Sequence, residues 1–160
     1  MKTKSPLQKK RDLILVITLF LLMGGVFLVY RMTAFRGESA SASVYYGTEK
    51  MVTVDFGLQN VNIVSKQAVE NKYYDLYGYN QFPYHDVEKN SIVLLGDYTV
   101  RGVRQLVVVS YDFEKKSMQI IDEKSPNNIC SKEGESTGFP LICLPNNIYV
   151  RFEQERQLEV

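Results

Sequence analysis

The chain has 160 residues, two cysteines, one histidine and a formal net charge of +1. It contains no phosphate-binding loop, dinucleotide-binding fingerprint, zinc-binding motif or paired-carboxylate signature, so the sequence points to none of the enzyme classes that depend on them. The acidic residues are scattered singly, which is typical of solvated surface positions.

The most apolar part of the sequence is Leu13–Tyr30, which contains no charged residue. At a rise of about 1.5 Å per residue, a helix of this length spans roughly 27 Å, close to the thickness of the hydrocarbon layer of a bilayer. Polar residues do not recur at every third or fourth position, as they would on an amphipathic helix of a soluble protein. We therefore predict a transmembrane helix over residues 13–30.

The charges beside this segment predict its orientation. Five basic residues precede it, namely Lys2, Lys4, Lys9, Lys10 and Arg11. Only Arg31 and Arg36 follow it closely, so the positive-inside rule predicts a cytoplasmic tail over residues 1–12 and an extracellular C-terminal part. The small-x-small sequence at residues 40–42 resembles a signal-peptide cleavage site but lies far beyond the apolar segment. We therefore expect a retained, single-pass plasma-membrane anchor.

The part after the anchor carries 14 basic and 17 acidic residues, a net charge of −3, which argues against nucleic acid as a partner. Residues 31–43 are rich in small and polar side chains and predict a linker. Residues 44–160 predict one β-rich domain with a single core. The predicted strands are Met51–Phe56, Val61–Val64, Ile92–Leu95, Leu106–Tyr111, Ser117–Ile121 and Ile148–Phe152. Gln67–Tyr77 is the one candidate helix of this domain, and the natural architecture is a small antiparallel β-barrel or roll.

The most specific stretch of the sequence is residues 125–152. It contains Cys130, Gly134 and the run Cys143-Leu144-Pro145-Asn146, followed by the last predicted strand. In these features it resembles the membrane-anchored NusG domain II family of Gram-positive bacteria. Members of that family carry a C-P-D-x-x-C element, then a glycine, then a stretch that ends in I-V-C-L-P-N. The resemblance covers about the last third of the chain and implies a fold and a location, but no biochemical activity and no cofactor.

The chain departs from the family pattern at two positions, because Ser125 and Asn127 stand where the family has cysteine and aspartate. Cys130 and Cys143 alone cannot form a multi-thiolate zinc site, which needs four ligands. Outside the membrane the two thiols can persist as a disulfide, and closing a loop of about 14 residues would stabilise the fold by about 3 kcal/mol. Two buried free thiols and a redox pair are the alternatives.

Five tyrosines gather between residues 73 and 84. They are Tyr73, Tyr74, Tyr77, Tyr79 and Tyr84. Tyrosine combines an apolar face with a polar tip and is enriched at interfaces. This segment therefore predicts either a surface that contacts a protein or glycan, or an inserted helix packed on the β-domain.

Two enzyme classes provide alternative interpretations. His85, Cys143, Arg151 and Arg156 occur in the chain order of a sortase-like transpeptidase, although the Thr-Leu-x-Thr-Cys strand of sortases is missing. Residues 91–97 and 107–112 resemble the first strands of LytR-CpsA-Psr phosphotransferases, and Arg101 and Arg104 are candidate anion ligands. The Arg-Asp pair expected after a proline is replaced by Asn127 and its neighbours.

These observations favour a binding or accessory module of a bacterial envelope system with no catalysis of its own. Its expected partners are the lipid bilayer, through the N-terminal helix, and another membrane or envelope protein.

Overall fold

The computed structural model describes residues 6–33 and 39–154 of the chain, which form two separate compact units. The first unit contains one helix, α1 (Pro6–Thr33), which begins with a proline in the position where its missing N–H costs no hydrogen bond. The predicted span of residues 13–30 lies within α1. The predicted tail is helical from Pro6 on, and residues 1–5 lie outside the described part.

Helix α1 contains a stretch, Lys10–Val29, that is long and apolar enough to cross a membrane. The side chains of this stretch are exposed rather than packed against protein. Its one hydroxyl donor, Thr18 Oγ1, bonds the Ile14 carbonyl oxygen at 2.9 Å. This hydroxyl is therefore paired within the helix, as it would have to be inside a bilayer.

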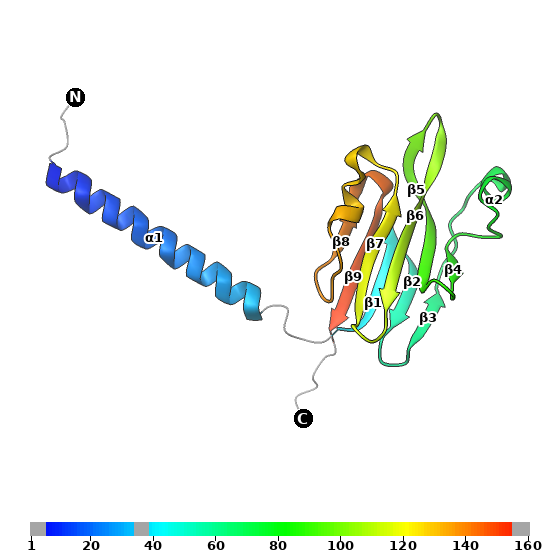
Figure 1. The fold of residues 1–160 in the computed structure, drawn as a ribbon, viewed down its shortest axis with the longest axis horizontal. Helices are drawn as coiled ribbons and strands as arrows, with labels where there is room; N and C mark the ends of the chain where they lie inside the picture. The colour runs from blue at the N-terminus through cyan, green and yellow to red at the C-terminus, as the bar shows by residue number, and fades with distance from the viewer. Residues whose placement is uncertain (1–5, 34–38, 155–160) are drawn as a thin grey trace. The chain divides into compact units, whose positions relative to one another are not determined.

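The second unit consists of two antiparallel sheets, shown in Figure 1. The first sheet has the order β3-β2-β1-β9-β8, and the second has the order β4-β5-β6-β7. The strands of the first sheet are β1 (Ser39–Tyr46), β2 (Glu49–Asp55), β3 (Asn60–Ile63), β8 (Leu141–Cys143) and β9 (Ile148–Gln154). Those of the second are β4 (Tyr84–Asp86), β5 (Ser91–Val100), β6 (Val103–Asp112) and β7 (Ser117–Glu123).

The main core lies between the two sheets. Alternate residues of each strand enter it, such as Ala42 and Val44 of β1 and Ile92 and Leu94 of β5. The prediction of a mainly β, antiparallel domain is confirmed, and every predicted strand overlaps an observed one. The strands form two sheets rather than one closed barrel.

The predicted linker is wrong from Ser39 onward. Residues 39–43 belong to β1, which lies in the middle of the first sheet and pairs with both β2 and β9. The small residues there are needed because Ala42 is fully buried and Ser43 is covered on the opposite face. Residues 34–38 of the predicted linker lie outside the described part.

A second apolar cluster lies on the outer face of the second sheet. The segment between β3 and β5 covers Val93 and Leu95 with Phe82 and with a short helix, α2 (Asn71–Tyr77), which ends at Gly78 in the left-handed conformation. The predicted helix began too early. Gln67 lies outside any helix, and its side-chain amide pairs with both the N–H and the carbonyl of Leu95, at 2.8 and 2.7 Å.

Phe82 should be the residue on which this cluster depends, since its side chain is fully buried beneath the rings of Tyr74 and Tyr79. We expect Phe82→Ala to lower the free energy of unfolding by about 3–5 kcal/mol, because it removes a large buried ring and leaves a cavity. Denaturant unfolding of the full chain in detergent measures this. The control Leu58→Ala, at a side chain that is 78% exposed, should change stability by less than about 0.5 kcal/mol. Equal effects of the two substitutions would contradict the packing.

Candidate functional site

The loops after β7 bring the two cysteines together. Cys130 begins the 3₁₀ turn η2 (Cys130–Lys132), and Cys143 ends β8. The two form a disulfide with a Cα–Cα distance of 5.2 Å, within the usual range. The bond joins the irregular loop to an edge strand of the first sheet, so it holds the end of the domain opposite to where β1 begins (Figure 1).

The disulfide lies against a buried carboxylate. Glu123, the last residue of β7, is 1% exposed. Its Oε1 accepts the backbone N–H of Cys130 at 3.2 Å, and its Oε2 accepts the side-chain amide of Asn146 at 3.4 Å. Its hydrogen-bond partners in the described part of the chain are thus neutral donors.

Asn146 connects this group to the second sheet. It lies in the 3₁₀ turn η3 (Leu144–Asn146) and is fully buried. Its Nδ2 donates to Cys143 Sγ at 3.3 Å as well as to Glu123, and its Oδ1 accepts the backbone N–H of Tyr98 at 3.4 Å. A Cβ added at Gly96 would come within 2.1 Å of that Oδ1, so β5 needs a glycine at the point where Asn146 meets it.

The remaining residues of the family-like motif have local roles. Gly134 adopts a φ of +81°, a conformation that favours glycine. Pro145 lies within η3, whereas Leu144 is 81% exposed. The hydroxyl of Ser125, where the resembled family has cysteine, is buried and has no hydrogen-bond partner among the described residues.

Comparisons with known proteins add nothing to this geometry. No protein-family model, curated protein or solved structure matches the chain.

The tyrosine segment lies mainly over the second sheet. Tyr73 is buried, and the rings of Tyr74, Tyr77, Tyr79 and Tyr84 are partly buried against the outer cluster. The hydroxyl of Tyr77 donates to the carbonyl of Arg104 at 2.6 Å, and burial raises the pKa of that hydroxyl. Packing of an inserted segment therefore accounts for most of the ring surface.

The two candidate anion ligands, Arg104 and Arg101, lie in different surroundings. Arg104 Nε donates to the Gly96 carbonyl at 2.8 Å, and its Nη2 donates to Tyr46 Oη at 2.8 Å and to Asp97 Oδ1 at 3.1 Å. These contacts tie β6 and β5 to β1. Arg101 lies in the exposed turn between β5 and β6, with a φ of +52°.

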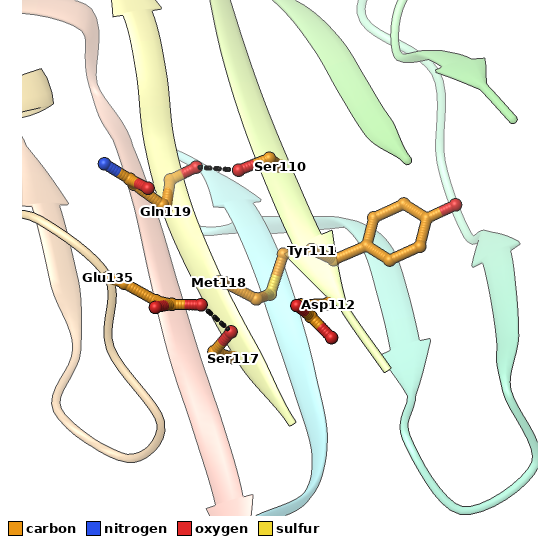
Figure 2. A pocket seen from close by; sticks show the side chains of 7 residues that line it. All are labelled: Ser110, Tyr111, Asp112, Ser117, Met118, Gln119 and Glu135. Carbon is orange, nitrogen blue, oxygen red and sulfur yellow. Dashed lines mark hydrogen bonds between the residues drawn. The ribbon is translucent and has the colours of Figure 1, made fainter. Parts of the chain in front are cut away.

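A shallow polar pocket of about 170 Å³ lies beside β6 and β7, as Figure 2 shows. Its lining residues are Ser110, Tyr111, Asp112, Ser117, Met118, Gln119 and Glu135. Ser117 Oγ donates to Glu135 Oε1 at 2.6 Å, and this bond, together with Lys115, lowers the pKa of Glu135. The hydroxyl of Ser117 and the carboxylate of Glu135 are therefore already paired with each other.

Two members of the disulfide site carry different sequence signals. Asn146 is part of the motif, whereas nothing in the sequence distinguishes Glu123 from the solvated acidic residues. Strict alternation along β7 would place Asp122 inward. The register shift opposite Val108 and Val109 makes Ile121 the extra residue of β7 and changes the phase, so that Asp122 is exposed and Glu123 is buried.

Gly96→Ala tests the contact with Asn146. The added methyl must displace the buried amide from its partners, and we expect a loss of about 1–3 kcal/mol in unfolding free energy. In the double variant with Asn146→Ala the contacts with the amide are gone and only the 2.9 Å contact with the Cβ of residue 146 remains, so the double variant should lose less stability than the sum of the two single losses. Denaturant unfolding of the four proteins in the cycle measures this coupling. Additive losses would show that the two residues do not interact.

His85 provides a pH test. Its Nε2 lies 2.8 Å from Tyr111 Oη, and burial lowers the pKa of the imidazole below 6.5, while Asp86 opposes the shift. The unfolded chain then binds the proton more readily than the folded one. The contribution of neutral His85 to stability is therefore fully present above pH 6.5 and is lost as the pH falls through the folded-state pKa. We expect the thermal unfolding midpoint to decrease as the pH is lowered from 7.5 to 5.5, and to decrease less in the variant His85→Gln. The chain has one histidine, so its NMR titration reports this pKa directly. A folded-state pKa above 6.5 would contradict the prediction.

Proposed function

We propose that this protein is a membrane-anchored, extracytoplasmic binding or accessory module of a bacterial envelope system, without catalysis of its own. Helix α1 supplies the anchor. The excess of basic residues before it supports a cytoplasmic N-terminus. The Cys130–Cys143 disulfide supports placing the β-domain outside, because such bonds persist in oxidising compartments.

The resemblance of residues 125–152 to the membrane-anchored NusG domain II family of Gram-positive bacteria supports the same location. Transcription is not implied, because the domain would lie on the wrong side of the membrane. A net charge of −3 after the apolar segment also supports a partner other than nucleic acid.

The observation that carries the binding function is a group of exposed apolar side chains beside the disulfide. Ile129, Ile142 and Leu144 are 57%, 46% and 81% exposed, and we call them the apolar loop patch. Each is adjacent in sequence to one of the bonded cysteines, so their Cα atoms lie within about 13 Å of one another. Exposed apolar groups on stiff loops favour a protein contact. The tyrosine segment offers mostly half-buried rings, so we place the contact with an envelope protein on the apolar loop patch.

The contacts of the candidate catalytic residues favour binding over the two enzyme alternatives. A sortase-like reaction needs a free thiolate, but Cys143 is bonded to Cys130. An anion site at Arg104 would compete with its contacts to Asp97 and Tyr46. Arg156, the last residue of the sortase-like pattern, lies outside the described residues.

The location is tested with C-terminal fusions of the full chain in a bacterial host. Alkaline phosphatase is active only outside the cytoplasm, and a fluorescent protein of the ordinary kind folds only inside. We expect phosphatase activity without fluorescence, whereas the reverse pattern would overturn the extracytoplasmic location.

The contact surface is tested by cross-linking in cells that express the tagged chain. Replacing the three patch residues by serine should reduce the cross-linked partner at least fivefold. Leu58→Ser with Val87→Ser is the matched control, since these residues are 78% and 67% exposed in other loops. Equal cross-linking of both variants would contradict a contact through the apolar loop patch.

A further inference from the structure

We propose that Glu123, Cys130 and Cys143 form a redox-gated site for a thiophilic divalent cation, with Zn²⁺ as the best fit. One donor atom from each residue lies within 4.8 Å of the other two. All three residues are 1% exposed or less. The donors come from β7, η2 and β8, so the fold rather than a local sequence motif brings them together.

The burial of Glu123 without a positively charged partner is the second observation that points to a cation. Its carboxylate is buried, and the hydrogen bonds that it accepts from Cys130 and Asn146 are long and come from neutral groups. No lysine or arginine forms an ion pair with it among the described residues. A buried carboxylate without a positive partner is costly, and a bound cation would balance its charge.

The donor set selects the kind of cation. Two thiolates and one carboxylate suit zinc, which binds sulfur and oxygen ligands in a tetrahedron and accepts water as the fourth ligand. Calcium and magnesium require mostly oxygen ligands, which this cluster does not supply. Asn146 already donates to Glu123 and to Cys143 Sγ, and therefore orients two of the three ligands.

The disulfide closes this site. While the two sulfurs are bonded to each other, they are not thiolates and cannot ligate a metal. A protein dithiol can open the site by exchange: it gives two electrons and two protons, the Cys130–Cys143 bond breaks, and the dithiol becomes a disulfide. Cation binding then releases the two thiol protons. The ion would replace the covalent link between η2 and β8, so the loop stays attached in both states.

The test uses the full chain in detergent micelles, with Co²⁺ as a spectroscopic probe and Zn²⁺ as its competitor. After reduction by a phosphine and its removal without oxygen, we expect one Co²⁺ per chain, with thiolate charge-transfer absorption that Zn²⁺ abolishes. The oxidised protein should show no such absorption. Zn²⁺ should also raise the thermal unfolding midpoint of the reduced protein but not that of the oxidised protein.

The variant Glu123→Gln keeps the shape of the side chain and removes its charge, and it should bind Co²⁺ at least tenfold more weakly. Asp122→Asn is the matched control, since Asp122 is the exposed neighbour of Glu123 on the same strand. Should Glu123→Gln fail to fold, Cys143→Ser takes its place and should abolish the charge-transfer absorption. Reduced wild-type protein that shows no thiolate absorption, or that is unfolded and not restored by Zn²⁺, overturns the proposal. So does unchanged affinity in Glu123→Gln.

Discussion

The end of the domain that contains the disulfide depends on the hydrogen bonds of one buried side chain, that of Asn146. Its amide reaches Glu123 of β7 and Cys143 of β8, and its oxygen reaches the backbone of β5 at Tyr98. One polar group thus connects both sheets. A buried amide without these partners would cost more than the bonds contribute, so the three strands must stay in register around it. Gly96 completes the contact, because only a residue without a side chain leaves room for the amide.

Arg104 provides a second connection between the sheets, and it differs from the first in exposure. Its guanidinium lies 5.4 Å from the ring of Tyr46 and pairs with Asp97, at the edge of the domain. Exposed ion pairs contribute little by themselves, but here the same group also satisfies the carbonyls of Leu95 and Gly96. Arg104 and Asn146 therefore both hold the β5–β6 hairpin near Gly96. The turn at Arg101 and Gly102, where Arg101 has a φ of +52°, lies beyond these contacts.

How far the sequence predicts the molecule depends on how local each signal is. The apolar segment of α1 was predictable because its length and composition alone meet the requirement of a bilayer. The strands β5, β6 and β7, which form two consecutive hairpins, were predictable from their alternating pattern and their β-branched residues. β1 was not, because its serines and alanines are determined by crowding in the middle of a sheet, and the same residues also suit a linker. Glu123 was missed because one register shift, which no local pattern reveals, buries it in place of Asp122. The pairing of Cys130 and Cys143 stayed open in the sequence, since two cysteines 13 positions apart do not reveal their distance in space.

The same constraints explain why apolar side chains remain exposed beside so stiff a structure. Leu144 lies between a bonded cysteine and a proline, and the next residue is the fully buried Asn146. The backbone there cannot rotate to bury Leu144 without withdrawing Asn146 from Glu123 and from β5. Ile142 lies on β8 between Leu141 and Cys143, which both face the core, so the alternation of the strand directs the Ile142 side chain outward. Their exposure is therefore imposed by the contacts that hold the disulfide site together, and an apolar surface maintained in this way is ready for a partner without rearrangement.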